Sequence, residues 1–377
     1  CDGCAYLRPR NLRSHDTHTS DAAEHAETDA ASDAGADLRA PAAREHGRQL
    51  SVIGSRSWTA LGMRVEVLTQ DPAALRSASA AVERVLTEVD ATLSRFRADS
   101  ELARVNQNAG RRLRVSPLFG GTLMAALRGA RRTGGAVDPT IGAALRRLGY
   151  DRDFELLPAR GPIVLHVERV PGWQAIQFDA LSLTLRVPAG VELDLNCTGK
   201  AVAVDLAAEA AHAAAGCGVL VGIGGDLRCA GPAPDEGWHV LASEDSRNGP
   251  VGPGQTIAIQ GGALATSSTM VRRWRRGDQT MHHLVDPATG RPAEGPLRTA
   301  TVAASTCVDA NLLATWALIR GDDAMASLRQ DRVPARLIQL DGSLLYLGGW
   351  PVPTPPPRGS HPAESPDTCG VGEGRVA

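Results

Sequence analysis

Two histidines and a nearby carboxylate form the clearest acid–base pattern in the chain. His282 and His283 are followed by Asp286 in the run His-His-Leu-Val-Asp-Pro-Ala-Thr-Gly. Histidine exchanges protons near neutral pH, so an imidazole here is a candidate general base. An alternative of equal weight is a polar turn in which Asp286 caps the Asp-Pro-Ala-Thr-Gly bend. The run by itself leaves both interpretations open.

A glycine-rich segment follows a predicted buried strand. Gly222, Gly224 and Gly225 precede Asp226, and glycines let backbone N–H groups approach a phosphate or a sugar closely. For an isolated Gly-Gly-Asp, an ordinary tight turn is the favoured interpretation. The segment lacks the Gly-x-Gly-x-x-Gly spacing and does not open a helix, so a Rossmann dinucleotide site is not supported.

Oxygen-bearing side chains stand four residues apart late in the chain. Asn311 and Thr315 share one face of a predicted helix, close enough to bind one hard cation together, whereas Asp309 points elsewhere. For such a pair alone, a solvated or capped helix face is the favoured interpretation. Two other segments place acids before glycines at the ends of elements, where functional side chains often lie: residues 138–142 and 194–200.

Hydrophobic spacing predicts the elements that carry these segments. Helices are predicted from Asp71-Pro72 to Val89, over 116–133 with Ser116 as cap, from 199 to Gly216, and over 309–319. Strands are predicted at 63–68, 219–223, 256–260, 299–304, 335–340 and 343–347. Helices and strands mix without strict βαβ alternation, which predicts an α+β fold of mixed sheets packed with helices.

Composition divides the chain of 377 residues into three parts. Residues 1–54 contain few large apolar side chains, so burial cannot offset the entropy of ordering them, and we expect disorder. The Pro-rich tail at 350–377 is expected to be disordered as well. One folded domain is therefore predicted over 55–349.

Charge and hydropathy exclude two classes of protein. The net charge is −2 and both signs are interspersed, so no concentrated basic patch indicates a nucleic-acid partner. The hydrophobic content is 43%, yet no uninterrupted apolar run reaches the length of about 18 residues that a transmembrane helix requires. We therefore expect neither nucleic-acid binding nor a transmembrane segment.

The cysteines and the first residue bear on the compartment. Cys1 and Cys4 form a CxxC without a second pair, which is weak support for zinc; unpaired thiols in a reducing compartment are favoured. A start at Cys1 fits either a mature lipoprotein with an acylated cysteine or a sequence that lacks its true start. The second is favoured because no lipobox or signal segment is visible. The compartment stays open, with a slight preference for the cytoplasm.

Seven segments resemble, in order, the motifs of the ApbE family of flavin transferases, over about 58–348. Residues 93–102 look like the family's L-S-x-Y-x-x-x-S-x-L segment, 135–142 like G-x-F/M-D-x-T-V-G, and 193–205 like D-L-G-G-I-A-K-G-Y-A-x-D. The other four are Gly224-Gly225-Asp226, 263–267, 283–290 and 310–315. Because the order and intervals are those of the family, chance agreement is negligible.

The resemblance implies a fold and a reaction. It implies an ApbE-like fold in which an acceptor Ser or Thr hydroxyl of a target flavoprotein attacks the FMN phosphate of FAD and releases AMP, with Mg²⁺ required. By position, Phe96 would lie on the isoalloxazine ring and His283 would be the general base. The other residues expected to bind FAD are Leu61, Ala136, Val137, Asp138, Asp194, Lys200, Gly225, Asp226 and Val285. Mg²⁺ would be held by the carbonyls of Cys197 and Ala314 and by the side chains of Asn311 and Thr315.

Three departures from the family pattern matter. Asn311 replaces the usual Asp, and an amide brings no negative charge, so weaker metal binding is expected. Leu61-Gly62-Met63 stands where the family has Met-Gly-Thr, and Phe96 replaces a stacking Tyr while keeping the ring face. Two alternatives follow: an enzyme that hydrolyses FAD to FMN and AMP, and a non-catalytic FAD-binding protein.

Overall fold

The computed structural model describes residues 35–41, 53–152, 154–158, 160–161, 170–245 and 252–353. The Cys1–Cys4 pair and the proline-rich end beyond 353 lie outside the described residues. Within the described ranges, no helix is long and apolar enough to cross a membrane.

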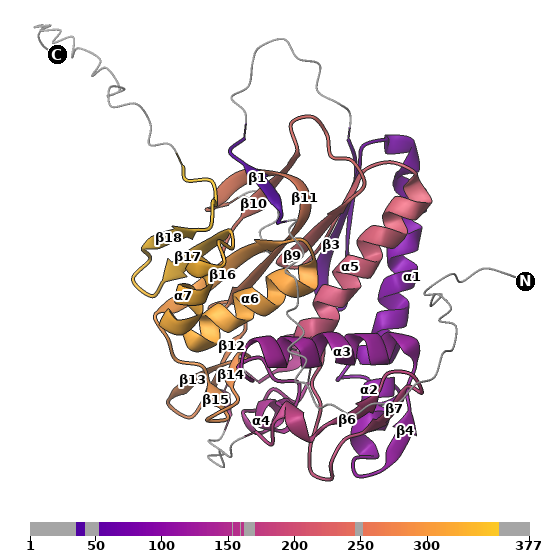
Figure 1. Cartoon of the computed structure of the whole chain (residues 1–377), viewed down its shortest axis with the longest axis vertical. Helices are drawn as coiled ribbons and strands as arrows, with labels where there is room; N and C mark the ends of the chain where they lie inside the picture. Colours follow the sequence, from indigo (N-terminus) through magenta and orange to yellow (C-terminus); the bar gives the residue numbers. More distant parts are fainter. Residues whose placement is uncertain are drawn as a thin grey trace, which may run out of the picture. The chain divides into compact units, whose positions relative to one another are not determined.

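A large antiparallel sheet forms the centre of the structure (Figure 1). The order of its main path is β18 (Leu344–Leu347), β17 (Ala335–Gln339), β16 (Leu297–Ala304), β11 (Gln255–Ser268), β9 (Asp226–Ala230), β8 (Val219–Ile223), β3 (Met63–Thr69) and β2 (Gly54–Ala60). Neighbouring strands along this path all pair antiparallel. β8 is buried almost throughout, as its run of Val, Leu and Ile predicts.

The long strand β11 joins two parts of this sheet. Its first half pairs with β10 (Trp238–Ala242) and β1 (Asp37–Arg39), and its second half pairs with β9 and β16. Gly262 lies where the pairing changes, with φ +85°, and a Cβ there would approach the Ala304 carbonyl oxygen at 2.7 Å. Only glycine fits this conformation in so little space.

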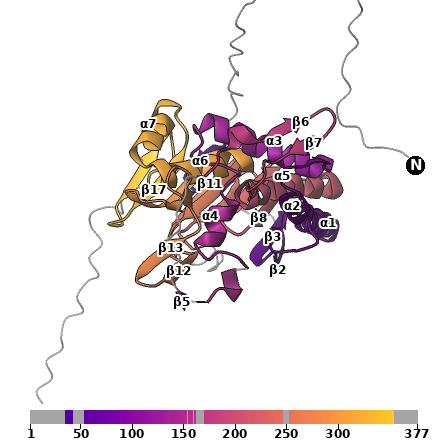
Figure 2. The same cartoon turned by 90° about the horizontal axis from the view of Figure 1, so that it is seen from below.

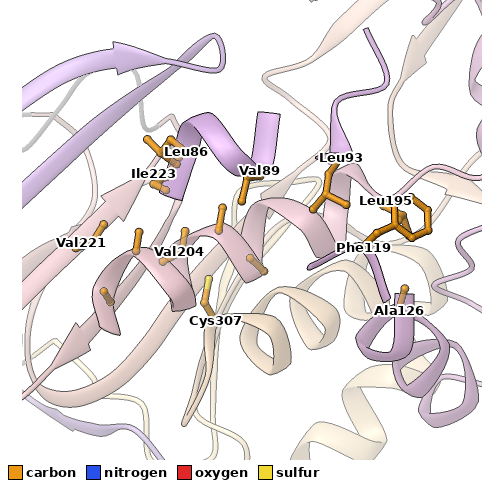
Figure 3. Close-up of a cluster of buried hydrophobic side chains, with 14 of the residues drawn as sticks. Leu86, Val89, Leu93, Phe119, Ala126, Leu195, Val204, Val221, Ile223 and Cys307 are labelled. Atoms are coloured by element: carbon orange, nitrogen blue, oxygen red, sulfur yellow. The ribbon is translucent and has the colours of Figure 1, made fainter. Parts of the chain in front are cut away.

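Three helices pack against the sheet: α1 (Leu75–Leu93), α5 (Asn196–Ala215) and α6 (Cys307–Arg320). Figure 3 shows side chains of α1, α5 and β8 interleaved in the largest apolar cluster. The buried face of α5 consists mainly of alanine and glycine, which lets α1 approach closely. A Cβ at Gly199 would lie 3.1 Å from Leu93 Cδ1, so this contact depends on the missing side chain.

Seven further helices complete the described part of the fold. They are η1 (Pro72–Ala74), α2 (Glu101–Gln107), α3 (Pro117–Arg132), α4 (Gly142–Arg147), η2 (Phe154–Leu156), η3 (Trp173–Ala175) and α7 (Asp322–Gln330). Ser116 caps α3 by accepting a hydrogen bond from the Phe119 N–H at 3.2 Å, and Pro117 occupies the first helical position. The predicted start of this helix is therefore confirmed.

The described residues also form three small sheets. Their strands are β4 (Arg112–Arg114), β6 (Gln177–Asp179) and β7 (Thr184–Arg186); β5 (Arg160–Gly161), β12 (Arg273–Arg276) and β13 (Gln279–His282); and β14 (Val285–Asp286) with β15 (Arg291–Pro292). Figure 2 shows the β12–β13 hairpin beside β5, with which β12 pairs parallel. Leu145 and Leu148 at the end of α4 pack against Trp274 and Met281 of this hairpin.

The α+β prediction and every predicted helix and strand are confirmed, whereas both limits of the folded domain need correction. Asp37–Arg39, expected to be disordered, forms β1 because β11 offers it an unpaired edge. Trp350, assigned to the disordered tail, is 2% exposed and donates from Nε1 to Gln255 Oε1 at 3.0 Å. Its large apolar ring gains more from covering the sheet than a free tail could.

Candidate functional site

A cavity of about 930 Å³ opens among the ends of these elements. Its volume lies in the upper part of the range of small-molecule sites. Residues expected from the sequence to bind a ligand line its wall, from segments far apart in the chain: Leu61, Phe96, Ala136, Val137, Asp138, Asp194, Cys197, Lys200, Gly225, His283, Val285, Asn311 and Thr315. The fold therefore gathers these predicted residues in one place.

A two-residue turn between β2 and β3 carries Leu61 to the wall. Leu61 and Gly62 have φ of +53° and +64°, so both adopt left-handed backbone. This is the I′ geometry that suits tight hairpins, and it is unusual for leucine. The turn holds the Leu61 side chain at the cavity at a cost in backbone strain.

The Gly224-Gly225 turn joins β8 to β9, so the tight-turn interpretation is confirmed. Gly224 has φ +62°, and the Gly225 carbonyl accepts a hydrogen bond from the Thr266 N–H at 2.9 Å. A Cβ at Gly225 would lie 3.1 Å from the Thr266 carbonyl oxygen. Both glycines also line the cavity, so the segment is at once a turn and part of the wall.

Hydrogen bonds to its own loop and to η3 occupy the Asp138 carboxylate. Oδ1 accepts from the Thr140 N–H at 2.8 Å and from the Thr140 hydroxyl at 2.7 Å, and Oδ2 accepts from the Trp173 N–H at 2.9 Å. The residue is 5% exposed. Asp138 therefore shapes the wall by holding the main chain, with little capacity left for a ligand.

Asp194 and Phe96 are held by a residue that the sequence analysis did not single out, Arg95. Arg95 Nη1 lies 2.6 Å from Asp194 Oδ2, and Nη2 donates to the Tyr150 carbonyl oxygen. The guanidinium carbon also lies 4.7 Å from the centre of the Phe96 ring and 4.4 Å from that of Tyr150. Stacked in this way, Arg95 orients the Phe96 ring, which is 38% exposed at the wall. A signal was present, since Arg95 lies inside the recognised 93–102 segment.

Of the two adjacent histidines, only His283 lines the cavity. His282 lies with Nε2 3.1 Å from the Ala293 carbonyl oxygen. Burial, together with the nearby charge of Arg272, holds the pKa of His283 well below its usual value, so the imidazole is neutral near pH 7. His283 Nδ1 is buried without a hydrogen-bond partner within the described ranges. A neutral imidazole facing a cavity can accept a proton.

Asp286 belongs to the turn and does not orient His283. Its Oδ1 accepts from the Ala288 N–H at 3.1 Å, and its carbonyl accepts from the Gly290 N–H at 2.8 Å. Arg320 Nη1 lies 3.4 Å from the same carboxylate. For Asp286, the turn interpretation is therefore confirmed.

The predicted cation ligands Asn311 and Thr315 meet around the Cys197 thiol. Cys197 Sγ donates to Asn311 Oδ1 at 2.8 Å and lies 3.5 Å from Thr315 Oγ1. Thr315 Oγ1 also lies 3.1 Å from the hydroxyl of Ser267, another residue without a predicted role. Asn311 and Thr315 are 3% and 4% exposed, so the interpretation as a solvated helix face is wrong. Burial raises the pKa of the Cys197 thiol to about 11, so it keeps its proton.

Asp226 supplies the negative charge beside these ligands. Its Oδ2 accepts from Asn311 Nδ2 at 3.1 Å and lies 2.9 Å from Lys200 Nζ. Its Oδ1 is buried and has no hydrogen-bond partner among the described residues. An orphaned carboxylate oxygen, an amide oxygen and a hydroxyl are the hard donors that Mg²⁺ prefers, so the donor set fits a cation of this kind.

Two predicted site residues lie behind the wall. Asp226 has a fully buried side chain, and Ala314 is buried in the cluster between α6 and the sheet. In the described part of the chain, no three His, Cys, Asp or Glu side chains come together in a way that could hold a metal. The carbonyl roles assigned to Cys197 and Ala314 stay predictions.

Arg272 was also missed by the sequence analysis. It lines the cavity and lowers the pKa of His283 by its charge, and it forms no ion pair with an acid in the described ranges. An arginine in that position is available to an anionic ligand. The adjacent arginines 272 and 273 were the sequence signal for such a role.

Comparison with known sequences shows which family of proteins the chain matches. The model of the ApbE family matches residues 61–338. A Haemophilus influenzae protein named FAD:protein FMN transferase is 27% identical over 252 residues, covering 64% of this chain and 72% of that protein. A Treponema pallidum protein of the same name is 28% identical over 309 residues, covering 76% and 82%.

Solved structures agree on the fold. The ApbE protein of Thermotoga maritima superposes with a TM-score of 0.67 at 22% identity, over 78% of this chain and 97% of that one. The flavin transferase ApbE of Vibrio cholerae gives 0.65 at 24% identity over the same shares. The α+β architecture derived above is therefore that of these proteins.

Proposed function

Because the chain belongs to the ApbE family, we propose that it transfers FMN from FAD to a hydroxyl group of a protein and releases AMP. The observation that carries the proposal is the cavity of about 930 Å³, which brings together predicted site residues from position 61 to position 315. The name FAD:protein FMN transferase, borne by relatives that align over two thirds or more of their own length, supports it.

In this proposal the isoalloxazine ring lies against Phe96. Phe96 is exposed at the wall while Arg95 and Tyr150 pack around its ring, so the ring is held in place before the ligand arrives. Leu61 and Val285 add apolar surface, and the glycines of the β8–β9 turn allow close approach of the main chain. Arg272 and Lys200 supply positive charge on the wall for the diphosphate.

The transfer itself is a substitution at phosphorus. The acceptor Ser or Thr oxygen forms a bond to the phosphorus of the FMN half, and the bond from that phosphorus to the AMP oxygen breaks. His283 takes the hydroxyl proton, and AMP leaves as a phosphate monoester. A neutral His283 suits this step, since a protonated imidazole could not accept the proton.

Mg²⁺ belongs to the same proposal. Asn311, Thr315 and the carbonyls of Cys197 and Ala314 would hold it, with the Asp226 carboxylate beside them. Bound with FAD, the ion would neutralise charge on the diphosphate. Because Asn311 is neutral, the diphosphate itself has to contribute much of the negative charge, so we expect Mg²⁺ to bind weakly or not at all before FAD does.

The test is an incubation of the purified protein with FAD and Mg²⁺, with and without a flavoprotein domain that carries an acceptor Ser or Thr. AMP is measured by chromatography, and flavin attached to the acceptor is measured by mass and by fluorescence in a denaturing gel. We expect AMP and covalent flavin in equal amounts only when the acceptor is present. An acceptor with Ala at the modified position is the matched control.

The other outcomes would overturn the proposal. AMP without covalent flavin, at the same rate with either acceptor, would make the protein an FAD hydrolase. Intact FAD that stays bound through the incubation would make it a flavin carrier.

A further inference from the structure

The Cys197 thiol lies where the two predicted cation-binding side chains come closest to each other. It is 2.8 Å from Asn311 Oδ1 and 3.5 Å from Thr315 Oγ1. Cys197 is in the first turn of α5 and the other two are one turn apart in α6, so the packing of these two helices creates the contact. Of the three, Cys197 has no counterpart in the family motif, which has glycine there.

The thiol completes a hydrogen-bonded network in the protein without ligand. Cys197 donates to the Asn311 carbonyl oxygen, and the Asn311 amide N–H donates to Asp226 Oδ2 at 3.1 Å. Lys200 Nζ lies 2.9 Å from the same oxygen, Asp226 Oδ2. The unpartnered atom that remains in this network, among the described residues, is Asp226 Oδ1, a buried carboxylate oxygen. The network therefore satisfies Asn311 while leaving one carboxylate oxygen, Asp226 Oδ1, that a cation could use.

We propose that the Cys197 thiol competes with the divalent cation for Asn311 Oδ1, so that Cys197 and Asn311 act as a coupled pair that makes cation binding conditional on FAD. A thiol hydrogen and a cation both bind to the lone pairs of that oxygen, and Mg²⁺ has little affinity for a thiol sulfur. The thiol must turn away before the ion can use the site. The proposal rests on the proposed function only for the identity of FAD as the ligand that brings the ion.

The proposal predicts how substitutions at Asn311 and Cys197 combine in their effect on cation binding. Asn311→Asp alone places a second carboxylate next to Asp226, where the amide N–H now donates at 3.1 Å, so the variant adds charge but also repulsion. Cys197→Ala alone removes the competitor and leaves Asp226 as the source of charge. Together, the two changes provide a carboxylate and free access, so their joint effect should exceed the product of the single effects.

The experiment measures Mn²⁺ binding by electron paramagnetic resonance, with the full chain free of FAD and again saturated with FAD. We expect wild type to bind Mn²⁺ far more weakly without FAD than with it. Cys197→Ala should lower the Kd of the FAD-free protein by about five- to tenfold, the effect of one competing hydrogen bond. Cys229→Ala, which removes a buried thiol from β9 outside the network, should leave the Kd unchanged. Cys197→Gly provides a second variant if the alanine variant unfolds.

Two results would overturn the inference. One is a Kd in FAD-free Cys197→Ala and Cys197→Gly that equals the wild-type value. The other is wild-type protein that binds Mn²⁺ equally well with and without FAD. Neither result depends on catalysis: if Mn²⁺ binding responds as expected but AMP never forms, the transferase proposal fails and the role of Cys197 stands.

Discussion

Acidic residues on the cavity wall serve mainly to organise other groups. Asp138 accepts two hydrogen bonds from Thr140 and one from the Trp173 N–H, and Asp194 accepts from the Asn196 N–H and pairs with Arg95. Their carboxylates are therefore occupied before any ligand binds. Groups that remain free to contact a ligand include the ring of Phe96, the imidazole of His283 and cationic side chains such as Arg272.

Replacement of Phe96 tests the placement of the flavin ring. Phe96→Ala should weaken FAD binding by about 1–2 kcal/mol, because a stacking contact and its buried area are lost. Phe96→Tyr keeps the ring and serves as the control. Fluorescence titration with FAD measures both. An unchanged affinity in the alanine variant would remove Phe96 from the flavin site.

Replacement of His283 tests the general base. His283→Ala should slow transfer about 10²- to 10⁴-fold while FAD affinity changes little. His282→Gln is the control, since that imidazole lies by the Ala293 carbonyl instead of the cavity. Transfer at the wild-type rate in His283→Ala would leave His283 a structural residue of the turn.

The depressed pKa of His283 also sets the sign of the pH dependence expected in the wild type. The base is lost only when it is protonated, and this requires a pH below its lowered pKa. The transfer rate should therefore not fall through this group until the pH drops below about 6.5, the ordinary histidine value. If the transfer rate begins to fall well above that pH, protonation of another group is responsible for the loss of activity.

Turns and the ends of elements form much of the cavity wall. The turns β2–β3 and β8–β9, the first turn of α5 and the last turn of α1 border the cavity, and α6 contributes Asn311 and Thr315 from its middle. α2 and α3 are joined to each other by Ser116, whose hydroxyl donates to Glu101 Oε2 at 2.5 Å and accepts from the Phe119 N–H. A single hydroxyl thus caps one helix and ties it to the other.

Ser116→Ala should lower the free energy of unfolding by about 1 kcal/mol, the usual cost of losing a helix cap. Urea unfolding followed by circular dichroism measures the change. Ser77→Ala is a matched control, because its exposed hydroxyl donates only to the carbonyl of Ala74 within the same helical turn. Equal stability of the two variants would show that the cap contributes nothing.

The main sheet depends on residues from both ends of the described chain. β1 adds to the edge of β11, and Trp350 packs in the same apolar cluster, with Trp238 and Ile259. This cluster involves β8, β9, β10 and β11, and on β8 it contains Leu220, whereas Val219 and Val221 belong to the cluster formed with α1 and α5. The folded unit therefore extends beyond the limits that composition suggested.

A chain that ends after Gly349 should lose about 3–5 kcal/mol of stability, the range for removing a buried tryptophan. A chain that ends after Pro353 retains Trp350 and the Gln255 contact, and it should unfold at the wild-type midpoint. Thermal and urea unfolding compare the two. If both chains were equally stable, the folded domain would end at residue 349, as the sequence predicted.

The sequence by itself determined the helices and strands with strong hydrophobic period, the capped start of α3, and the set of motifs that marks the family. These features depend on neighbouring residues, and local spacing expresses them directly. Short helices such as α2 and α4, with seven and six residues, contain too few turns for a hydrophobic repeat to be recognised in the sequence.

Only the tertiary structure decided which side chains touch. Cys197 and Asn311 are 114 residues apart, and Arg95 and Asp194 are 99 apart, yet each pair is in hydrogen-bond contact. Such contacts depend on the path of the whole chain and on the close packing of α5 against α1 and α6. The path of the chain cannot be read from neighbouring residues, so the sequence could name Cys197, Asn311 and Thr315 as predicted cation ligands but could not show that the Cys197 thiol lies beside Asn311 and Thr315.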